Sequence, residues 1–156
     1  MRDPSHLKIL VTGASGVTSR AVVKSLKLSD YFWTAKFIGT DICDNLYGVA
    51  EGLCDAIYRT PHTRDDKYTE IVSDVCKSEN IDFAIVIPEL EVLHWTHHKM
   101  PVPCLLPPRE FCNVAGSKVA LYRLLQNCQI VPKFEVMTRA ELAASEYALA
   151  TGWPCW

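Results

Sequence analysis

The sequence predicts an α/β fold, an open parallel sheet with helices on both faces. Short apolar runs alternate along the chain with segments whose apolar residues recur at helical spacing, as at Tyr68, Val72 and Val75. The runs are continuously apolar, which is typical of parallel strands that are covered on both sides. The first run leads directly into a glycine turn, Gly13 to Gly16, and then into a helix. Together these observations favour alternating strands and helices over an all-helical or all-strand protein.

The elements of the sheet are expected within residues 1–112. Strands are predicted over residues 8–12, 36–40, 56–59, 83–87 and 102–105. Helices are predicted over residues 17–26, 68–76 and 89–98, and residues 42–53 form an irregular connection that contains two glycines. This part of the chain therefore predicts one parallel sheet.

Residues 113–156 are expected to form a helical extension. A helix is predicted over residues 118–126, followed by an extended segment over 131–136. Thr138 and Glu141 match a capping box, which predicts a further helix towards Ala150 that ends at Gly152. The last four residues, 153–156, are apolar and aromatic and start a strand with no partner, so we expect this edge to promote self-association into a homo-oligomer.

Composition excludes several classes of protein. The chain has 156 residues, a formal net charge of -2 and no basic stripe, which argues against nucleic-acid binding. Since no apolar run approaches the ~20 residues that span a bilayer, we expect no membrane insertion. The seven cysteines show no C-x-x-C spacing and follow no secretory signal, so reduced thiols and a cytoplasmic location are expected.

Polar and glycine residues follow three of the predicted strands, and the carboxyl ends of parallel strands meet at one rim. We therefore predict a substrate site there. Its predicted members are Gly13, Ala14, Ser15, Gly16, Asp41, Glu89 and Glu91. A glycine turn before a helix directs backbone N–H groups and the positive end of the helix dipole towards an anion. The alternatives are that the glycines serve the turn alone and that Asp41 is a polar loop residue.

An NAD(P)-binding dehydrogenase or epimerase is the main alternative function, suggested by the glycine turn. The third glycine of the dinucleotide pattern is replaced by Ser19. No tyrosine is followed four residues later by lysine, so the catalytic pair of short-chain dehydrogenases is missing. A Walker sequence ending in Gly-Lys-Ser/Thr is also absent.

The sequence contains two further groups of potential ligand-binding side chains. Lys118 follows Ser117 at a predicted helix start. A cation there is unfavourable beside the positive end of the helix dipole, and a bound phosphate would make it favourable. The alternative is an exposed lysine whose charge is screened by solvent. His94, His97 and His98 share a predicted helix, but no H-E-x-x-H pattern or cysteine pair accompanies them, so no metal site is predicted.

Several motifs occur in order along nearly the whole chain: 11–16 (VTGASG), 81–83 (IDF), 87–91 (IPELE), 106–108 (LPP), Ser117 with Lys118, and 131–132 (VP). In this order they resemble the carbamoyl-phosphate synthase-like ATP-grasp proteins. The resemblance implies a Rossmann-like pre-ATP-grasp domain at the N-terminus, followed by the start of an ATP-grasp domain. It also implies that Lys118 contacts the nucleotide and that Gly13 to Gly16 and Glu89 face the substrate cavity.

In whole enzymes of this family, ATP and Mg²⁺ activate a small-molecule carboxylate as an acyl phosphate, which an amine then attacks. The family's next ATP-binding strand and its acidic magnesium ligands would follow residue 156. We therefore expect this chain to be a substrate-side domain without turnover of its own. A non-enzymatic interaction module that recruits a second chain through Trp153 to Trp156 remains a third possibility.

Overall fold

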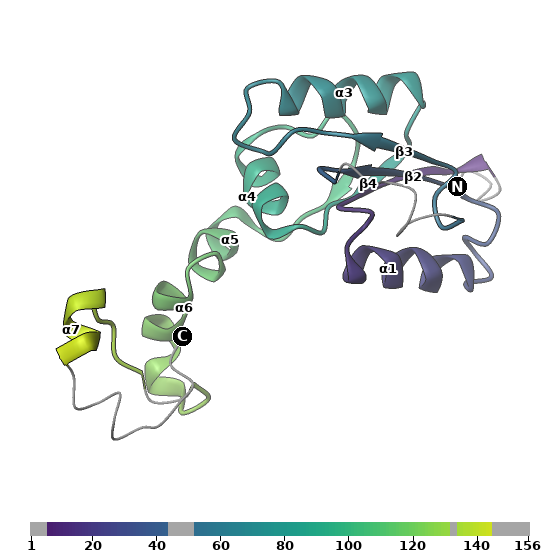
Figure 1. Cartoon of the computed structure of the whole chain (residues 1–156). Coiled ribbons are helices and arrows are strands. Elements are labelled where there is room, and N and C mark those ends of the chain that lie inside the picture. Colours follow the sequence, from purple (N-terminus) through teal and green to yellow (C-terminus); the bar gives the residue numbers. More distant parts are fainter. Residues whose placement is uncertain (1–5, 44–51, 132–133, 145–156) are drawn as a thin grey trace. The chain divides into compact units, whose positions relative to one another are not determined.

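The computed structural model describes residues 6–43, 52–131 and 134–144 (Figure 1). The chain divides into two compact units, residues 1–113 and residues 114–156. Within the described residues, no helix combines the length and apolar character needed to cross a membrane.

The first unit is built on five parallel strands in the order β3-β2-β1-β4-β5. The strands are β1 (Lys8–Thr12), β2 (Lys36–Asp41), β3 (Ala56–Arg59), β4 (Phe83–Ile85) and β5 (Cys104–Leu105). The chain builds outwards from β1 to β2 and β3, then returns to the other side of β1 to form β4 and β5. The strand order therefore reverses beside β1, where open α/β sheets generally bind their ligands.

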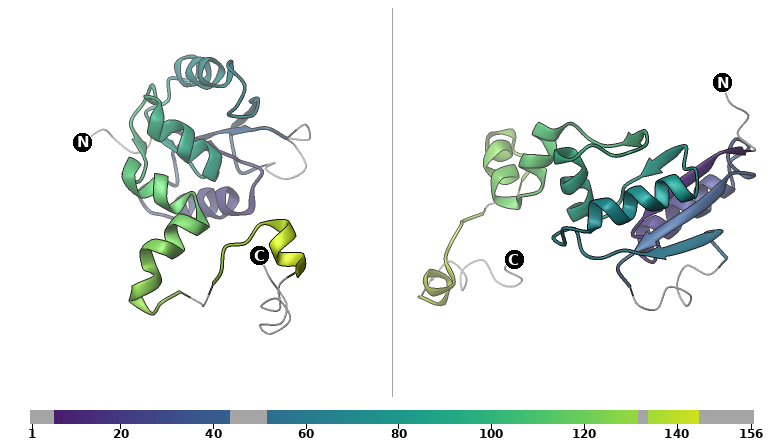
Figure 2. Two further views of the ribbon diagram at one scale, coloured as in Figure 1. Left: turned by 90° about the vertical axis from the view of Figure 1, so that its left-hand side faces the viewer. Right: turned by 90° about the horizontal axis from the view of Figure 1, so that it is seen from above.

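Helices cover both faces of this sheet, with α1 (Val17–Lys27) on one face and α3 (Tyr68–Ser78) on the other (Figures 1 and 2). Successive β1 side chains point to opposite faces, as the pleat of a strand requires. Val11 packs in one buried cluster with Val23 of α1. Leu10 packs in the other cluster with Val72 of α3 and with Trp95 of α4 (Glu89–His97). The α/β fold class predicted from the sequence is confirmed.

β4 and β5 are shorter than predicted. β4 ends at Ile85 instead of residue 87 because the backbone N–H of Ile87 donates to the side chain of Thr12 (3.2 Å). β5 begins at Cys104 instead of residue 102. Pro103 precedes it and has no N–H to give to a sheet, although its carbonyl still accepts from Ala84 N (2.9 Å).

A helix that the sequence did not predict, α5 (Arg109–Ala115), follows the two prolines at 107 and 108. Proline is favoured at helix starts because its fixed φ suits the first turn and its missing N–H has no partner there. The carbonyl of Pro108 accepts from Cys112 N (3.0 Å), and Cys112 is buried. The apolar spacing in this segment is too short to stand out from a loop.

The second unit contains α6 (Lys118–Leu125), the 3₁₀ helix η2 (Gln126–Cys128) and α7 (Arg139–Ala144). The predicted capping box is confirmed: Thr138 N donates to Glu141 Oε2 (2.6 Å), and Glu141 N donates to Thr138 Oγ1 (3.3 Å). Residues 134–138 form neither helix nor strand. The predicted continuation of the helix to Ala150, its end at Gly152 and the apolar residues 153–156 lie outside the described residues.

Candidate functional site

The carboxyl ends of β1, β2 and β4 are joined at one rim of the sheet by hydrogen bonds. Ala14 N, just past β1, donates to the carbonyl of Thr40 in β2 (3.0 Å). On the other side, Ile87 N in the segment after β4 donates to Thr12 Oγ1 (3.2 Å). The glycine turn is therefore fixed between its two neighbouring strands, as the sequence predicted for a rim built from strand ends.

Two glycines are required by the close packing of this rim. Gly13 has a φ of +61°, and a Cβ atom there would lie 2.4 Å from Cγ of Pro88. A Cβ on Gly39 would lie 2.7 Å from the Cβ of Ala14, so glycine in β2 lets the turn approach the strand. Both positions need glycine for steric reasons. The packing of the turn therefore explains the glycine at position 13 without a role in ligand binding.

Asp41 fastens the glycine turn to the end of β2. Its Oδ2 accepts from Ser15 N and its Oδ1 accepts from Cys43 N, both at 2.8 Å. Gly16 N donates to Gly13 O (2.8 Å). The amides of residues 14, 15 and 16 are thus all used within the protein. The anion that meets this turn is the protein's own carboxylate, which a helix N-terminus stabilises as it would a ligand.

Glu91 lies beside Asp41 in a buried hydrogen-bond network. It is 6% exposed, and the hydroxyl of Tyr68 donates to its Oε2 at 2.6 Å. Trp95 Nε1 in turn donates to the hydroxyl of Tyr68 (3.2 Å). Burial raises the pKa of the Glu91 carboxyl, and the nearby charge of Asp41 adds to the rise, whereas hydrogen bonds from Tyr68 and Thr12 oppose it. Burial and the neighbouring Glu91 charge also raise the pKa of Tyr68, which keeps its proton.

Asp41 and Glu91 border a cavity of about 400 Å³, a size that accommodates a small molecule. Its lining residues are Gly13, Ser15, Gly16, Asp41, Ile42, Cys43, His62, Thr63, Pro88, Leu90 and Glu91. Two of them are carboxylic acids, and none of the described lining residues is lysine or arginine. The cavity wall therefore offers hydrogen-bond acceptors, and its electrostatic character is acidic.

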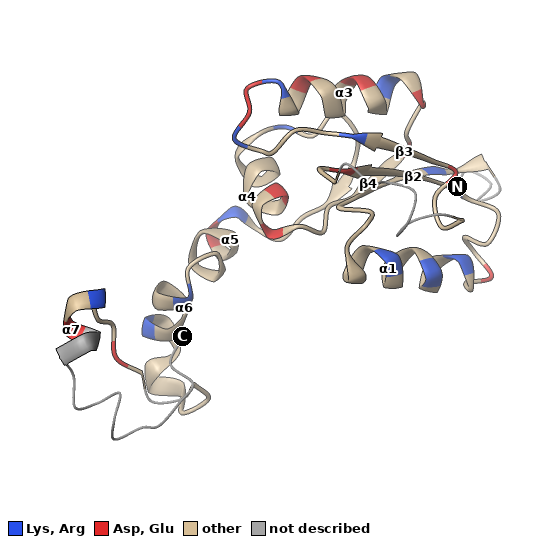
Figure 3. Cartoon of the chain, viewed as in Figure 1, with Lys and Arg blue, Asp and Glu red and all other residues tan. Residues whose placement is uncertain are grey.

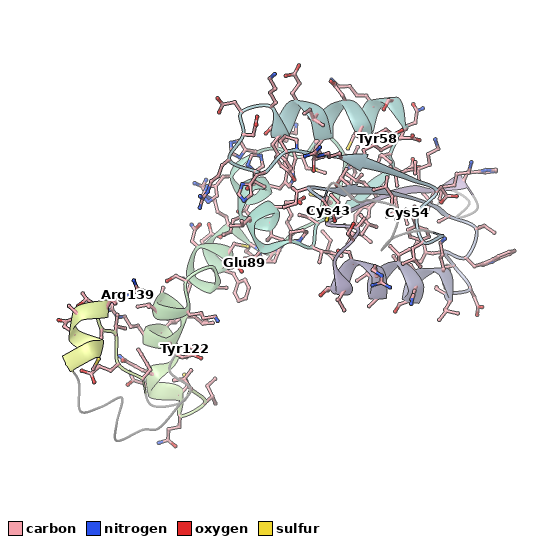
Figure 4. All side chains as sticks on the ribbon, viewed as in Figure 1. Cys43, Cys54, Tyr58, Glu89, Tyr122 and Arg139 are labelled. Atoms are coloured by element: carbon pink, nitrogen blue, oxygen red, sulfur yellow. The ribbon has the colours of Figure 1, made fainter. Side chains whose placement is uncertain are left out.

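The structure brings five of the predicted substrate residues together and separates the others. Gly13, Ser15, Gly16, Asp41 and Glu91 line the cavity. Ala14 is buried against Gly39 and does not line it. Glu89 is exposed at the start of α4 and is also absent from the lining (Figure 4). Two residues of helix place Glu89 and Glu91 about 200° apart around the axis, so only one of them faces the rim.

Lys118, predicted to contact a nucleotide, belongs to the second unit. It is exposed and is the first residue of α6. Ser117 caps that helix, since its Oγ accepts from Ala120 N (3.3 Å). The local geometry on which the prediction depended, a cation in the first turn of a capped helix, is present. The role of Lys118 stays a prediction.

Sequence reasoning missed three contributors to the cavity region. His62 and Thr63 line the cavity from the loop after Pro61, where no motif marks them. The helical spacing predicts Tyr68 on the apolar face of a helix, and it is fully buried, but its hydroxyl also donates a hydrogen bond to Glu91. A buried tyrosine usually finds a partner for its hydroxyl, and that expectation was the available signal.

His94 of α4 and His98, which follows the helix, form a separate cluster. His94 contacts Thr69 Oγ1 through Nε2 (2.9 Å), and its ring stacks on His98 with centroids 4.1 Å apart. Burial and the charge of His98 lower the pKa of His94. Among the described residues, no three histidine, cysteine or acidic side chains are grouped as metal ligands.

Comparison with solved structures identifies proteins of similar fold. The structure of glycinamide-RNase-transformylase T from Mycobacterium tuberculosis matches with a TM-score of 0.56 and 16% identity, over 86% of this chain and 39% of that one. The biotin carboxylase domain of a single-chain bacterial carboxylase matches with a TM-score of 0.58 and 11% identity, over 93% of this chain and 34% of that one. At these identities the likeness shows a shared fold.

The chain spans little more than a third of the length of either structure. No protein-family sequence profile matches the chain. No curated protein sequence matches it at a significant level. The Rossmann-like α/β fold that the sequence resemblance implied is confirmed.

Proposed function

We propose that this chain is the N-terminal, substrate-side domain of an ATP-dependent carboxylate–amine ligase of the carbamoyl-phosphate synthase-like ATP-grasp family. The ordered sequence motifs support this proposal, as does the fold shared with a glycinamide transformylase and a biotin carboxylase domain. In this proposal the Mg²⁺ ligands and most of the ATP site belong to parts of the enzyme beyond this chain, and this chain contributes one contact to the nucleotide through Lys118. The domain holds one substrate, and it has no turnover by itself.

The observation that carries the proposal is the cavity at the rim with Asp41 and Glu91 in its wall. Both carboxyl groups are at least nine-tenths buried, and both are fixed by hydrogen bonds. Carboxyl oxygens accept hydrogen bonds from N–H and O–H groups. The cavity therefore suits an amine or hydroxyl group of the substrate. The substrate's own carboxylate would face away from these acids.

In the dehydrogenase alternative, the backbone amides at the start of α1 would bind the pyrophosphate of the dinucleotide. Here Ser15 N is bonded to Asp41 and Gly16 N to Gly13 O. Ser19, which stands at the third glycine position, is buried and donates to the carbonyl of Thr12 (3.0 Å). We expect no enhancement of NADH or NADPH fluorescence on mixing with the protein. Saturable enhancement would favour the dehydrogenase function instead.

Lys118 is proposed to contact the nucleotide. A cation in the first turn of a helix costs about 0.3–1 kcal/mol, which a bound phosphate offsets. In the ligase that contains this chain, Lys118→Met should raise KM for ATP more than it lowers kcat. Arg123→Met, on the same helix and also exposed, removes the same charge and is the matched control.

The central experiment measures binding of small carboxylates that carry an amine or a hydroxyl group, by isothermal titration calorimetry. At least one should bind saturably to the wild-type chain, and binding should be lost in Glu91→Gln. Glu89→Gln is the control, because Glu89 has the same chemistry but lies outside the cavity. Equal losses in both variants, with both folded by circular dichroism, would contradict the assignment of Glu91.

A second measurement addresses turnover. The chain mixed with ATP, Mg²⁺ and a carboxylate that binds should release no more inorganic phosphate than the buffer control. Phosphate release that follows the protein concentration and survives repurification would show that the chain is itself a catalyst, which the proposal denies.

A further inference from the structure

The two helices on opposite faces of the sheet carry opposite charges on their exposed sides. Figure 3 shows lysine and arginine along α1 with no acidic residue, and several acidic residues along α3. We propose that the exposed side of α1 in one copy of this chain binds the exposed side of α3 in a second copy. This contact is separate from the edge at residues 153–156, and its support is independent of the ligase function.

The exposed side of α1 is a stripe of cations. Arg20, Lys24 and Lys27 are spaced by four and three residues, so they project from one side of the helix. Neither Arg20 nor Lys24 forms an ion pair with a described residue. Lys27 Nζ donates to a carbonyl group, that of Gly52 (3.4 Å), and not to an acid. The stripe therefore offers positive charge to the carboxylates of another molecule.

The exposed side of α3 carries the matching acids. Asp66 lies just before the helix, and Glu70 and Asp74 follow at intervals of four residues, so all three project from one side. Lys77 pairs with Asp74 (3.6 Å) near the C-terminal end of α3. Asp66 and Glu70 form no ion pair with a described residue. Two carboxylates in the N-terminal half of this stripe are thus available to cations.

Apolar side chains extend the α1 surface beyond the end of the helix. Leu28, Tyr31 and Trp33 are 86%, 69% and 68% exposed, and all lie within six residues. Hydrogen bonds fix the backbone of this turn, since Trp33 N donates to the carbonyl of Ser29 (3.1 Å). Exposed apolar residues that are grouped in this way mark interaction surfaces, and tryptophan and tyrosine contribute most to binding there.

A cavity lies at the corresponding end of the α3 surface. It has a volume of about 490 Å³, it opens where β3 ends and α3 begins, and its walls include Pro61, Lys67 and Ile71. Pro61 and Ile71 offer apolar contact, and a lysine such as Lys67 binds favourably over the face of an aromatic ring. The cavity therefore suits an aromatic side chain of a second copy.

The order of these features sets the direction in which the two helices pack. When α1 runs antiparallel to α3 of the second copy, the stripes pair in order: Arg20 with Asp74, Lys24 with Glu70, and Lys27 with Asp66. At ~1.5 Å per residue the two stripes span about 10 Å and about 12 Å, so their lengths agree. The aromatic turn after α1 then lies at the cavity before α3. Parallel helices would place this turn at the other end of α3, away from the cavity.

The proposed contact joins two different surfaces. Because α1 and α3 cover opposite faces of the sheet (Figures 1 and 2), a copy that binds through α1 still has its own α3 free. Such head-to-tail association continues into a ring or an open chain. Exposed ion pairs are individually weak and are screened by salt. Association should therefore increase with protein concentration and decrease with ionic strength.

The test is sedimentation velocity of the full chain over a range of protein concentrations. In about 20 mM salt the mean sedimentation coefficient should rise with concentration, and in about 500 mM salt it should rise much less. A chain that stays monomeric at the highest soluble concentration would overturn the proposal. Association that salt does not weaken would also overturn it, because the contact would then be apolar and not between the two charged stripes.

Charge-reversal variants identify the two surfaces. Lys24→Glu and Glu70→Lys should each weaken self-association by about tenfold or more, since attraction becomes repulsion. An equimolar mixture of the two variants should associate again, because the reversed α1 of one variant meets the reversed α3 of the other. A mixture that stays monomeric, with both variants folded by circular dichroism, would refute the pairing.

Two controls make the same changes of charge elsewhere. Lys99→Glu and Glu110→Lys alter exposed residues outside α1 and α3, and both should leave self-association unchanged. If the controls weakened association as much as Lys24→Glu and Glu70→Lys, only the net charge of the protein would matter. That result would contradict the proposed contact.

The aromatic turn is tested separately. Trp33→Ser should weaken self-association by about tenfold or more, as expected for a tryptophan at the centre of an interface. Phe111→Ser removes another exposed aromatic side chain, 58% exposed in α5, and should have no effect. Unchanged association in Trp33→Ser would show that the turn does not enter the cavity and would overturn the antiparallel arrangement.

Anionic vesicles test a different occupant for a surface that is both basic and aromatic. The protein should not sediment with vesicles made of equal parts phosphatidylcholine and phosphatidylserine. Binding to these vesicles but not to phosphatidylcholine alone, by a chain that stays monomeric in solution, would identify a lipid surface as the occupant of α1. That outcome would replace the second copy and overturn the proposal.

Discussion

The carboxylate of Asp41 accepts a hydrogen bond from the backbone N–H of Ser15 across the gap between β2 and the glycine turn. This single contact changes the interpretation of the turn. A glycine turn ahead of a helix usually offers its amides to a ligand phosphate. In this protein the Ser15 amide donates to a carboxylate of the protein itself. The cavity beside it is lined with hydrogen-bond acceptors, among them Asp41 and Glu91.

Asp41→Asn should destabilise the fold. Each carboxylate oxygen of Asp41 accepts from a backbone N–H, one from Ser15 and one from Cys43. Asparagine has one acceptor oxygen, so its NH₂ group must face one of the two amides. Because the site is buried, we expect a loss of about 1–3 kcal/mol in the free energy of unfolding, measured by urea denaturation.

The control for this prediction is Asp30→Asn, which removes the same charge at an exposed position outside the rim. It should change the free energy of unfolding by less than about 0.5 kcal/mol. If Asp30→Asn and Asp41→Asn proved equally stable, the hydrogen bonds to Ser15 and Cys43 would contribute nothing measurable.

Glu91→Gln should alter how stability depends on pH. Burial raises the folded-state pKa of Glu91 above its ordinary value of 4.5, so the folded protein binds this proton more tightly than the unfolded chain. Below pH 4.5 the carboxyl is protonated in both states. As the pH rises from there through the folded-state pKa, the wild type loses stability that glutamine does not lose. Glutamine still offers a carbonyl oxygen to Tyr68.

The measurement is urea denaturation of wild type and Glu91→Gln at several pH values between about 4 and 8. The advantage of the variant over the wild type should grow with pH and then level off. A constant difference across this range would show that Glu91 titrates alike in the folded and unfolded states. Glu89→Gln, at an exposed position on the same helix, is the control variant.

The strands of the sheet could be predicted from the sequence because each is a short apolar run next to a turn residue. The β1 run meets Gly13, and residues 83–87 meet Pro88. Apolar spacing and the turn-forming residues glycine and proline act on the local backbone, so each strand can be predicted from its own segment of the chain. Strand ends were less predictable, since Ile87 leaves the sheet for a contact with Thr12, 75 residues away in sequence.

The site was predictable only in outline. Strand ends converge by topology, which placed Asp41 and Glu91 at one rim. Which of Glu89 and Glu91 faces inwards depends on where α4 begins, and that was uncertain by a residue or two. The use of the Ser15 amide by Asp41, and the role of Tyr68 from a different helix, are tertiary contacts that no local pattern encodes.

Thiol reactivity should follow burial. Burial raises the pKa values of Cys54 and Cys76 to about 11, so at pH 8 almost none of either thiol is the reactive thiolate. Cys43 and Cys128 are exposed. We expect brief treatment with iodoacetamide to modify Cys43 and Cys128 well before Cys54 and Cys76, as judged by peptide mass spectrometry. Early modification of Cys76 would indicate that α3 opens readily from the sheet. Figure 4 labels one thiol of each kind, the exposed Cys43 and the partly buried Cys54.

Gly13→Ala and Gly52→Ala together separate conformational strain from crowding. Both glycines have positive φ, +61° and +72°, so alanine should cost about 1–2 kcal/mol at either position. A Cβ at Gly52 would meet no atom within 4 Å, whereas one at Gly13 would lie 2.4 Å from Pro88. Pro88 cannot move without shifting the start of α4, so crowding should add about 1–3 kcal/mol at Gly13 alone. Urea denaturation should therefore rank wild type above Gly52→Ala and Gly52→Ala above Gly13→Ala, and equal losses would mean that the turn moves away from Pro88 without resistance.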